Sequence, residues 1–244
     1  DTSPFNVSGY AAVCKDGVYR FIDSTGRDKS ICRRDIEITD VTFYTADLIA
    51  VQYDGKYHYC DFSFEEKFGA YDYAGSFSDG IAAVKDGNRW YFINTKGERL
   101  SDNDYEDIKV DGKGIAFRDG SALVRSGGVY YLVDTKEKKI GSDTYQDADA
   151  FNSSQPAAVF NGEKWGFIDA EGKLVCDYRF REARSFSNGF AAYSDGSGWG
   201  FIRLEDFSTA IDPAFEDAGD FTSSGSAFVK GSSGWDVIYL YLGL

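Results

Sequence analysis

One hairpin pattern, repeated seven times, constrains this chain more than any other feature. An apolar-Ala-Val element recurs, with steps of 38, 33, 40, 35, 34 and 36 residues between its middle residues. Such a period is typical of repeat architectures. The seven copies are 11–13, 49–51, 82–84, 122–124, 157–159, 191–193 and 227–229. Asp-Gly or Asn-Gly follows five of them, starting at Asp16, Asp54, Asp86, Asn161 and Asp195, and predicts two-residue hairpin turns because both residues tolerate positive φ.

An aromatic residue opens the second strand of every hairpin. The seven are Tyr19, Tyr57, Trp90, Tyr130, Trp165, Trp199 and Trp235, so all four tryptophans occupy one repeat position. Alternate residues of a strand share a face. We therefore expect the tryptophans to be core residues, packed in one layer with the residue two positions on. The residue between them should point away, where bulky side chains are tolerated.

The rest of each repeat predicts about three strands, with a second turn such as Glu171-Gly172 and a short third strand such as 173–178. A fourth short strand is expected around 215–221, and no helical period is present. One such unit cannot bury its apolar face alone, so neighbours must stack. The fold class is all-β: a propeller-like array of hairpin repeats of about 36 residues, or alternatively an open β-superhelix. We expect a single repeat domain over 1–244, with six full repeats and a terminal hairpin at 227–242.

Charge narrows the possible partners. The 26 Lys and Arg against 40 Asp and Glu give a net charge of −14, which repels nucleic acids and anionic lipids. No apolar stretch reaches the roughly 20 residues that span a bilayer. We expect a monomer that binds neither nucleic acid nor membrane. Cys60 takes a core position and predicts a buried thiol. Cys14 and Cys32 fall two strands apart, about 10 Å, too far for a disulfide within one sheet.

Residues with catalytic chemistry form no recognisable constellation. His58 is the only histidine, so any Ser-His-Asp or Cys-His arrangement would depend on it. The acidic run 102–107 lacks the glycine and glutamate of a calcium loop and predicts a solvated loop. No phosphate-binding glycine motif or CxxC pair is present. We therefore predict no catalytic residue, no metal site and no cofactor.

The segment Lys164 to Lys173, which reads KWGFIDAEGK, resembles the WG β-repeat family of bacterial proteins. The segments 180–192 and 215–221 are similar to the second half of the family pattern. The Trp-Gly pair itself occurs only at Trp165 and Trp199; the other copies have Arg20, His58, Tyr91, Tyr131 and Asp236 after the aromatic residue. The resemblance implies a bacterial protein in an extracellular or cell-envelope setting, with the cytoplasm left open. It implies no common chemistry.

Three functions compete. The first is a non-catalytic binding or scaffolding array that recognises a protein or a cell surface, favoured because scaffold positions repeat while surface positions vary. The second is a carbohydrate-binding propeller in which exposed side chains stack on sugars, with Tyr91, Tyr131 and His58 as the ligand-facing residues. The third is a glycoside-processing enzyme, which requires two carboxylates converging on one pocket.

Overall fold

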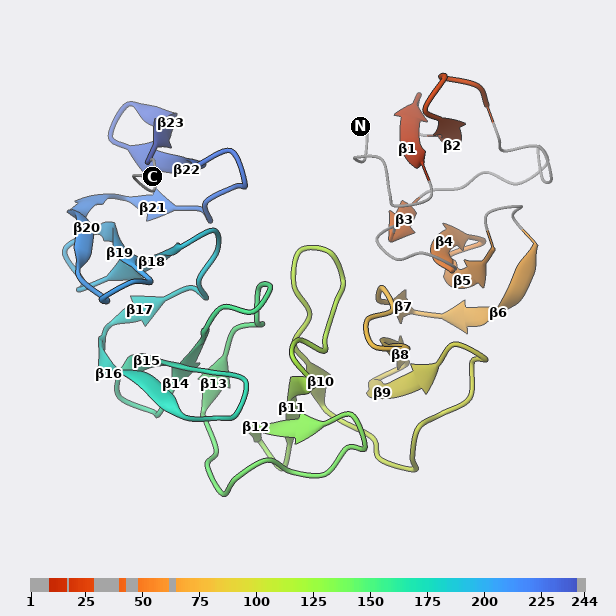
Figure 1. The fold of residues 1–244 in the computed structure, drawn as a ribbon, viewed down its shortest axis with the longest axis horizontal. Helices are drawn as coiled ribbons and strands as arrows, with labels where there is room; N and C mark the ends of the chain where they lie inside the picture. Colours follow the sequence, from red (N-terminus) through yellow and green to blue (C-terminus); the bar gives the residue numbers. More distant parts are fainter. Residues whose placement is uncertain (1–8, 17, 29–39, 43–47, 62–64, 241–244) are drawn as a thin grey trace. The chain divides into compact units, whose positions relative to one another are not determined.

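The computed structural model describes residues 9–16, 18–28, 40–42, 48–61 and 65–240, and every regular element in these ranges is a β-strand (Figure 1). The chain forms two compact units. The first comprises the described residues of 1–117 with 135–137, and the second comprises 118–134 with the described residues from 138 onward. The described residues contain no apolar helix of membrane-spanning length.

Seven antiparallel sheets are found in the described part of the chain, and each is centred on one predicted hairpin. The hairpins confirm the sequence period. Their strands are β1 Tyr10–Lys15 with β2 Val18–Asp23, β4 Ile49–Tyr53 with β5 Lys56–Cys60, β8 Ile81–Asp86 with β9 Arg89–Asn94, β11 Ser121–Ser126 with β12 Val129–Asp134, β14 Ala157–Phe160 with β15 Trp165–Ile168, β18 Phe190–Ser194 with β19 Trp199–Arg203, and β22 Ser226–Gly231 with β23 Gly234–Tyr239.

Two further kinds of strand flank the hairpins, so the full repeat has four strands rather than three. A strand of two or three residues precedes the hairpin: β3 Asp40–Thr42, β7 Tyr73–Ala74, β10 Asp107–Ile108, β13 Asp147–Ala148, β17 Glu182–Ala183 and β21 Asp217–Ala218. A longer outer strand follows it in three repeats: β6 Glu66–Tyr71, β16 Leu174–Phe180 and β20 Thr209–Phe215. The predicted third strand at 173–178 is therefore β16. Around the predicted fourth strand at 215–221, β20 ends and β21 forms.

The hairpin turns confirm the sequence reading in one copy and correct it in another. Tyr53 pairs with Lys56, so Asp54 and Gly55 form a two-residue turn, with φ of 52° and 76°. In the next hairpin Asp86 still pairs with Arg89, and the turn moves one residue on. The glycine, rather than the aspartate before it, is the feature common to these two turns.

Single residues join neighbouring sheets. Only Asp72 separates β6 from β7, only Arg181 separates β16 from β17, and only Glu216 separates β20 from β21. The backbone N–H of Arg181 donates to the carbonyl of Ser194 at 2.9 Å, so even this linking residue is tied to the following sheet. These three pairs of sheets are therefore linked by one residue each, whereas longer segments join β9 to β10 and β12 to β13.

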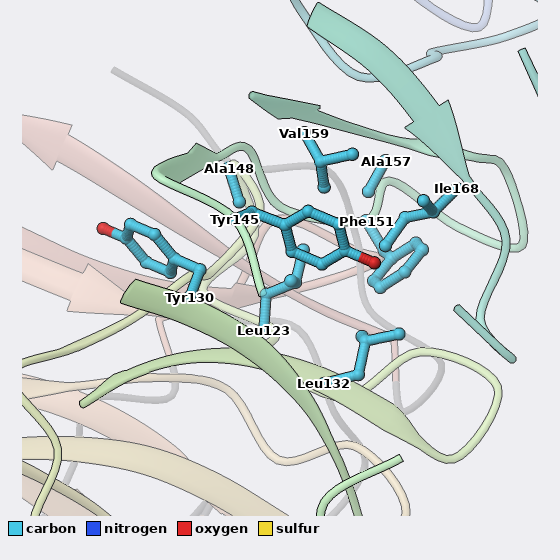
Figure 2. Packing of buried hydrophobic residues seen from close by; sticks show 9 residues of the cluster. All are labelled: Leu123, Tyr130, Leu132, Tyr145, Ala148, Phe151, Ala157, Val159 and Ile168. Atoms are coloured by element: carbon cyan, nitrogen blue, oxygen red, sulfur yellow. The ribbon is translucent and has the colours of Figure 1, made fainter. Parts of the chain in front are cut away.

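Side chains from consecutive sheets interlock to form the core. In the second unit, Leu123 and Leu132 of one sheet face Ala157, Val159 and Ile168 of the next, and the rings of Tyr145 and Phe151 lie among them (Figure 2). Equivalent clusters fill the other repeats, with rings such as Phe167 and Phe186 at 4.8 Å between centroids. Burying aromatic and branched aliphatic side chains contributes about 1.5–3 kcal/mol each.

Hydrogen bonds also tie one repeat to the next through the segments before the hairpins. The buried Ser185 hydroxyl accepts from the N–H of Ala158 at 2.9 Å. The Ser187 hydroxyl donates to the carbonyl of Phe221 at 2.8 Å, and Asn188 Nδ2 donates to the same carbonyl at 2.7 Å. In the first unit the N–H of Ser76 donates to the carbonyl of Gly114 at 2.8 Å. These bonds satisfy polar groups that stacking removes from water.

The cysteine predictions have separate outcomes. Cys60 is buried and forms no disulfide, which confirms the expected thiol. Cys14 is free and half-buried. Cys32 lies outside the described residues.

Candidate functional site

His58, one of the three residues predicted to face a ligand, is held on β5 by its neighbours. Its ring stacks on Tyr53 with 3.9 Å between centroids and an interplanar angle of 12°. Its Nδ1 lies 3.2 Å from Glu66 Oε1 on β6, and its side chain is 13% exposed. These contacts orient the imidazole against the outer strand.

Tyr91 and Tyr131, the other two predicted residues, each lie under a cation. The guanidinium carbon of Arg99 is 4.2 Å from the centre of the Tyr91 ring, and Lys139 Nζ is 5.2 Å from that of Tyr131. Burial raises the pKa of Tyr91. His58 and Tyr91 belong to the first unit and Tyr131 to the second. As ligand contacts, all three remain predictions.

The position that follows the strand-opening aromatic is more constrained than the sequence indicated. A Cβ on Gly200 would lie 2.4 Å from the carbonyl oxygen of Ile211 and 2.8 Å from the nitrogen of Pro213, both in β20. A Cβ on Gly166 would lie 2.9 Å from the carbonyl oxygen of Cys176 in β16. The expectation that bulky side chains are tolerated here is wrong for these two repeats, because the outer strand bulges across the position.

Where the second position is not glycine, the outer segment compensates. Opposite His58 the glycine is on the outer strand instead, and a Cβ on Gly69 would lie 2.5 Å from His58 Cα. Opposite Tyr91 and Tyr131, the following segment forms only isolated bridges at its two ends, such as Trp90 with Tyr105. A continuous outer strand therefore comes with glycine on one side of the pair.

The tryptophans are less buried than predicted. Trp90, Trp165 and Trp199 are half-buried, and Trp235 is 59% exposed. The core expectation is wrong for Trp235 and incomplete for the others. All four lie near the start of the second strand, at the turn end of their hairpins.

A polar groove of about 470 Å³ in the second unit uses one of these rings. Trp199 lines it together with Arg181, Glu182, Glu216 and the turn 196–198. The guanidinium of Arg184 lies 5.2 Å from the Trp199 ring and its Nη2 is 3.0 Å from Asp217 Oδ1. An aromatic face beside fixed charges of both signs suits a polar ligand with an apolar face, such as a sugar or an extended peptide.

A second hollow, of about 590 Å³, lies at the opposite end of the same sheets and is mainly apolar. Phe190, Leu204 and Leu240 line it, with hydroxyl groups of 222–224 beside them. The hydroxyls of Thr222, Ser224 and Ser226 bond to one another at 2.8–3.0 Å. They are therefore already engaged within their turn.

Exposed large apolar side chains gather on the terminal hairpin. Phe228 and Tyr239 are each 60% exposed, Trp235 59% and Val237 37%, and all four belong to β22 or β23. Only Leu174, at 37%, joins them among the large hydrophobic side chains of the described residues. Large exposed apolar patches mark interaction surfaces. The sequence set 227–242 apart as a terminal hairpin, but the repeat positions of these residues gave no sign that their side chains are exposed.

The carboxylates of the described residues form no group of three with histidine or cysteine that could hold a metal ion. In the acidic run 102–107, Asp104 accepts from Arg99 Nη2 at 2.7 Å. Burial raises the pKa of Asp220, and the charge of Asp149 adds to the rise. Neither carboxylate lines the groove or the apolar hollow.

A comparison with protein families finds a known repeat in three segments of the chain. The model described as WG containing repeat matches residues 69–90, 165–199 and 199–231. The last two matches cover the residues that line the polar groove and the first strand of the terminal hairpin, and they end before β23. No curated protein matches the chain.

Solved structures show the fold. Hsv2 of Kluyveromyces lactis is 10% identical with a TM-score of 0.51, over 98% of this chain and 96% of that one. A structure of the eukaryotic initiation factor is 9% identical with a TM-score of 0.59, over 95% of this chain and 70% of that one. The chain thus has an all-β, propeller-like fold, and at these identities the likeness extends to the fold alone.

Proposed function

We propose that this WG-repeat, propeller-like protein is a non-catalytic binding protein that recognises another protein through its terminal hairpin. The supporting observation is the patch of Phe228, Trp235, Val237 and Tyr239, whose equivalents in other repeats are largely covered. Exposed tryptophan and tyrosine dominate the energetics of many protein interfaces. An extracellular or cell-envelope location belongs to this proposal and rests on the family resemblance.

The test uses a photo-cross-linking phenylalanine derivative at position 235 and, as the matched control, at position 165. Both positions open the second strand of a hairpin, but only 235 is exposed. Irradiation in an extract of the source organism should yield a discrete cross-linked protein at 235 and none at 165. Equal labelling at both positions, or none at 235, would contradict the proposal. So would turnover of any substrate that a single substitution abolishes.

Binding of a glycan is the second candidate, favoured by the groove at Trp199. A sugar stacking on this ring should quench tryptophan fluorescence and should be detected on a glycan array. Trp199→Ala should abolish the signal, whereas Trp90→Ala, in the other unit and outside the groove, should preserve it. Silence across common bacterial glycans would remove this candidate.

A further inference from the structure

The outer edge of β23 differs from those of β5, β9, β12, β15 and β19, each of which pairs with a following strand or, through isolated bridges, with a following segment. In three repeats a strand of the chain covers this edge: β6 covers β5, β16 covers β15 and β20 covers β19. In each case an aromatic residue of the outer strand faces the aromatic that opens the hairpin's second strand, so the register is the same in all three. The pairs are Tyr57 with Tyr71, Trp165 with Phe180 and Trp199 with Phe215. Within the described residues, β23 pairs only with β22.

We propose that the edge of β23 accepts an added β-strand from a partner protein, and that this strand carries glycine opposite Asp236 and aromatic residues opposite Trp235 and Val237. The proposal deepens the proposed function, on which it rests. Strand addition supplies affinity through backbone hydrogen bonds and specificity through alternate side chains. The chain itself shows what such a strand looks like.

The backbone of β23 presents a donor on its outer side. The N–H of Val237 donates to the carboxylate of Asp236 at 2.7 Å and so points away from β22. The short edge strands use the same device, since Ala148 and Ala218 each donate to the preceding aspartate at 2.8 Å. A side chain that occupies an edge donor discourages indiscriminate strand pairing. A specific partner must replace that carboxylate with its own carbonyl.

Asp236 also dictates which strand fits. It stands where Gly166 and Gly200 allow β16 and β20 to pass at less than 3 Å from the site of a missing Cβ. With aspartate there, strands of that kind would collide with its Cβ. The β6 arrangement avoids the collision, because Gly69 on the added strand faces the bulky His58. The partner strand should therefore follow the pattern of Phe68, Gly69 and Tyr71.

The charge of the protein and the poor fit of a second copy of β23 further restrict which partner strand can bind. Asp236 is the only charged residue of β23, and the whole chain has a net charge of −14, so a basic segment is favoured. A second copy's β23 fits poorly. Its only glycine is Gly234, at the first position of the strand. In an antiparallel pair, bringing that glycine opposite Asp236 would leave half of each strand, residues 237–239, unpaired.

The experiment measures binding of a fluorescent peptide to the full 244-residue protein by anisotropy. The probe has the sequence of residues 66–71 between flanking lysine pairs, and its control has valine in place of the glycine. We expect the glycine peptide to bind at least tenfold more tightly. Asp236→Gly should abolish this preference and create binding of a peptide with the sequence of residues 174–180.

Two further arms test the backbone contact. Val237→Pro removes the outward N–H while leaving the pairs with β22, and should abolish binding with an unchanged circular dichroism spectrum. If that variant misfolds, a probe N-methylated at the tyrosine that corresponds to Tyr71 tests the same strand pairing on the native protein, because the aromatic opposite the strand-opening residue supplies the backbone hydrogen bonds in the other repeats, as Tyr105 does to Trp90. Equal binding of the glycine and valine peptides would overturn strand addition. So would the absence of binding at 1 mM peptide, which means a binding free energy weaker than about 4 kcal/mol. Concentration-dependent dimers without peptide binding would assign the edge to a second copy and overturn it too. Cross-linking at 235 without peptide binding would leave the proposed function standing and remove only this inference.

Discussion

The glycine after Trp199 offers a sharp test of how the outer strands are held. Gly200→Ala would place a Cβ 2.4 Å from the carbonyl oxygen of Ile211, 2.8 Å from the nitrogen of Pro213 and 2.9 Å from the carbonyl carbon of Asp212. All three atoms belong to the backbone of β20, so no side chain can rotate away. The strand itself must move and loosen its register on β19.

The expected cost follows from two opposing effects. Overpacking costs typically about 1–3 kcal/mol. Alanine in place of glycine returns about 0.4–1 kcal/mol by restricting the unfolded chain. The net loss of about 1–2 kcal/mol lowers Tm by roughly 2–8 °C in a protein of this size. Thermal unfolding followed by circular dichroism measures this shift.

Two alanine variants provide the controls. Gly166→Ala brings its Cβ no closer than 2.9 Å to a neighbouring atom, so its loss should be smaller. Gly231→Ala has no atom within 4 Å of the new Cβ and should be neutral or stabilising. If Gly200→Ala proved as stable as Gly231→Ala, the role assigned to this glycine would be refuted.

Two further predictions concern buried polar groups. Ser185→Ala leaves the N–H of Ala158 buried without its acceptor and should lower the free energy of unfolding by about 1–3 kcal/mol. Ser187→Ala should cost only about 0.5–1.5 kcal/mol, because Asn188 still donates to the Phe221 carbonyl. Urea unfolding measures both losses, and a larger loss for Ser187→Ala would contradict these roles. Asp220→Asn should raise Tm at pH 7. Burial raises the pKa of Asp220 in the folded state above its ordinary value, so its ionisation at neutral pH costs stability, which is recovered as the pH falls below the pKa of the unfolded state. The two Tm curves should converge near pH 3, and a gap that persists there would exclude an electrostatic origin.

The repeats and their hairpins could be read from the sequence because two signals coincide in each copy. An apolar-Ala-Val run flanks the turn on one side and an aromatic-x-apolar run flanks it on the other. The short strands, such as β13 and β17, gave no signal, because two residues cannot show alternation. They form because the hairpin beside them offers unpaired backbone groups.

The constraints on Gly166 and Gly200 could not be derived from spacing alone, since they depend on a strand that follows later in the chain. A signal does exist in retrospect: segments that alternate apolar with polar residues, 174–180 and 209–215, follow the two Trp-Gly copies, whereas the polar run 101–104 follows Trp90. The exposure of Trp235 was hidden for a related reason. Its repeat position is that of the half-buried Trp90, Trp165 and Trp199, and what differs is that no further sheet follows β23 among the described residues.

The one-residue links between sheets have a mechanical consequence. Because Arg181 and Glu216 each join an outer strand directly to the next sheet, pulling on one sheet in this unit moves its neighbour, with no linker to absorb the displacement. Equivalent surface points on β15, β19 and β23 thus keep a fixed pitch. A partner that is itself periodic, such as a polymer or a filament, could engage several of these points in register, and each contact after the first would form without the entropy of a new encounter.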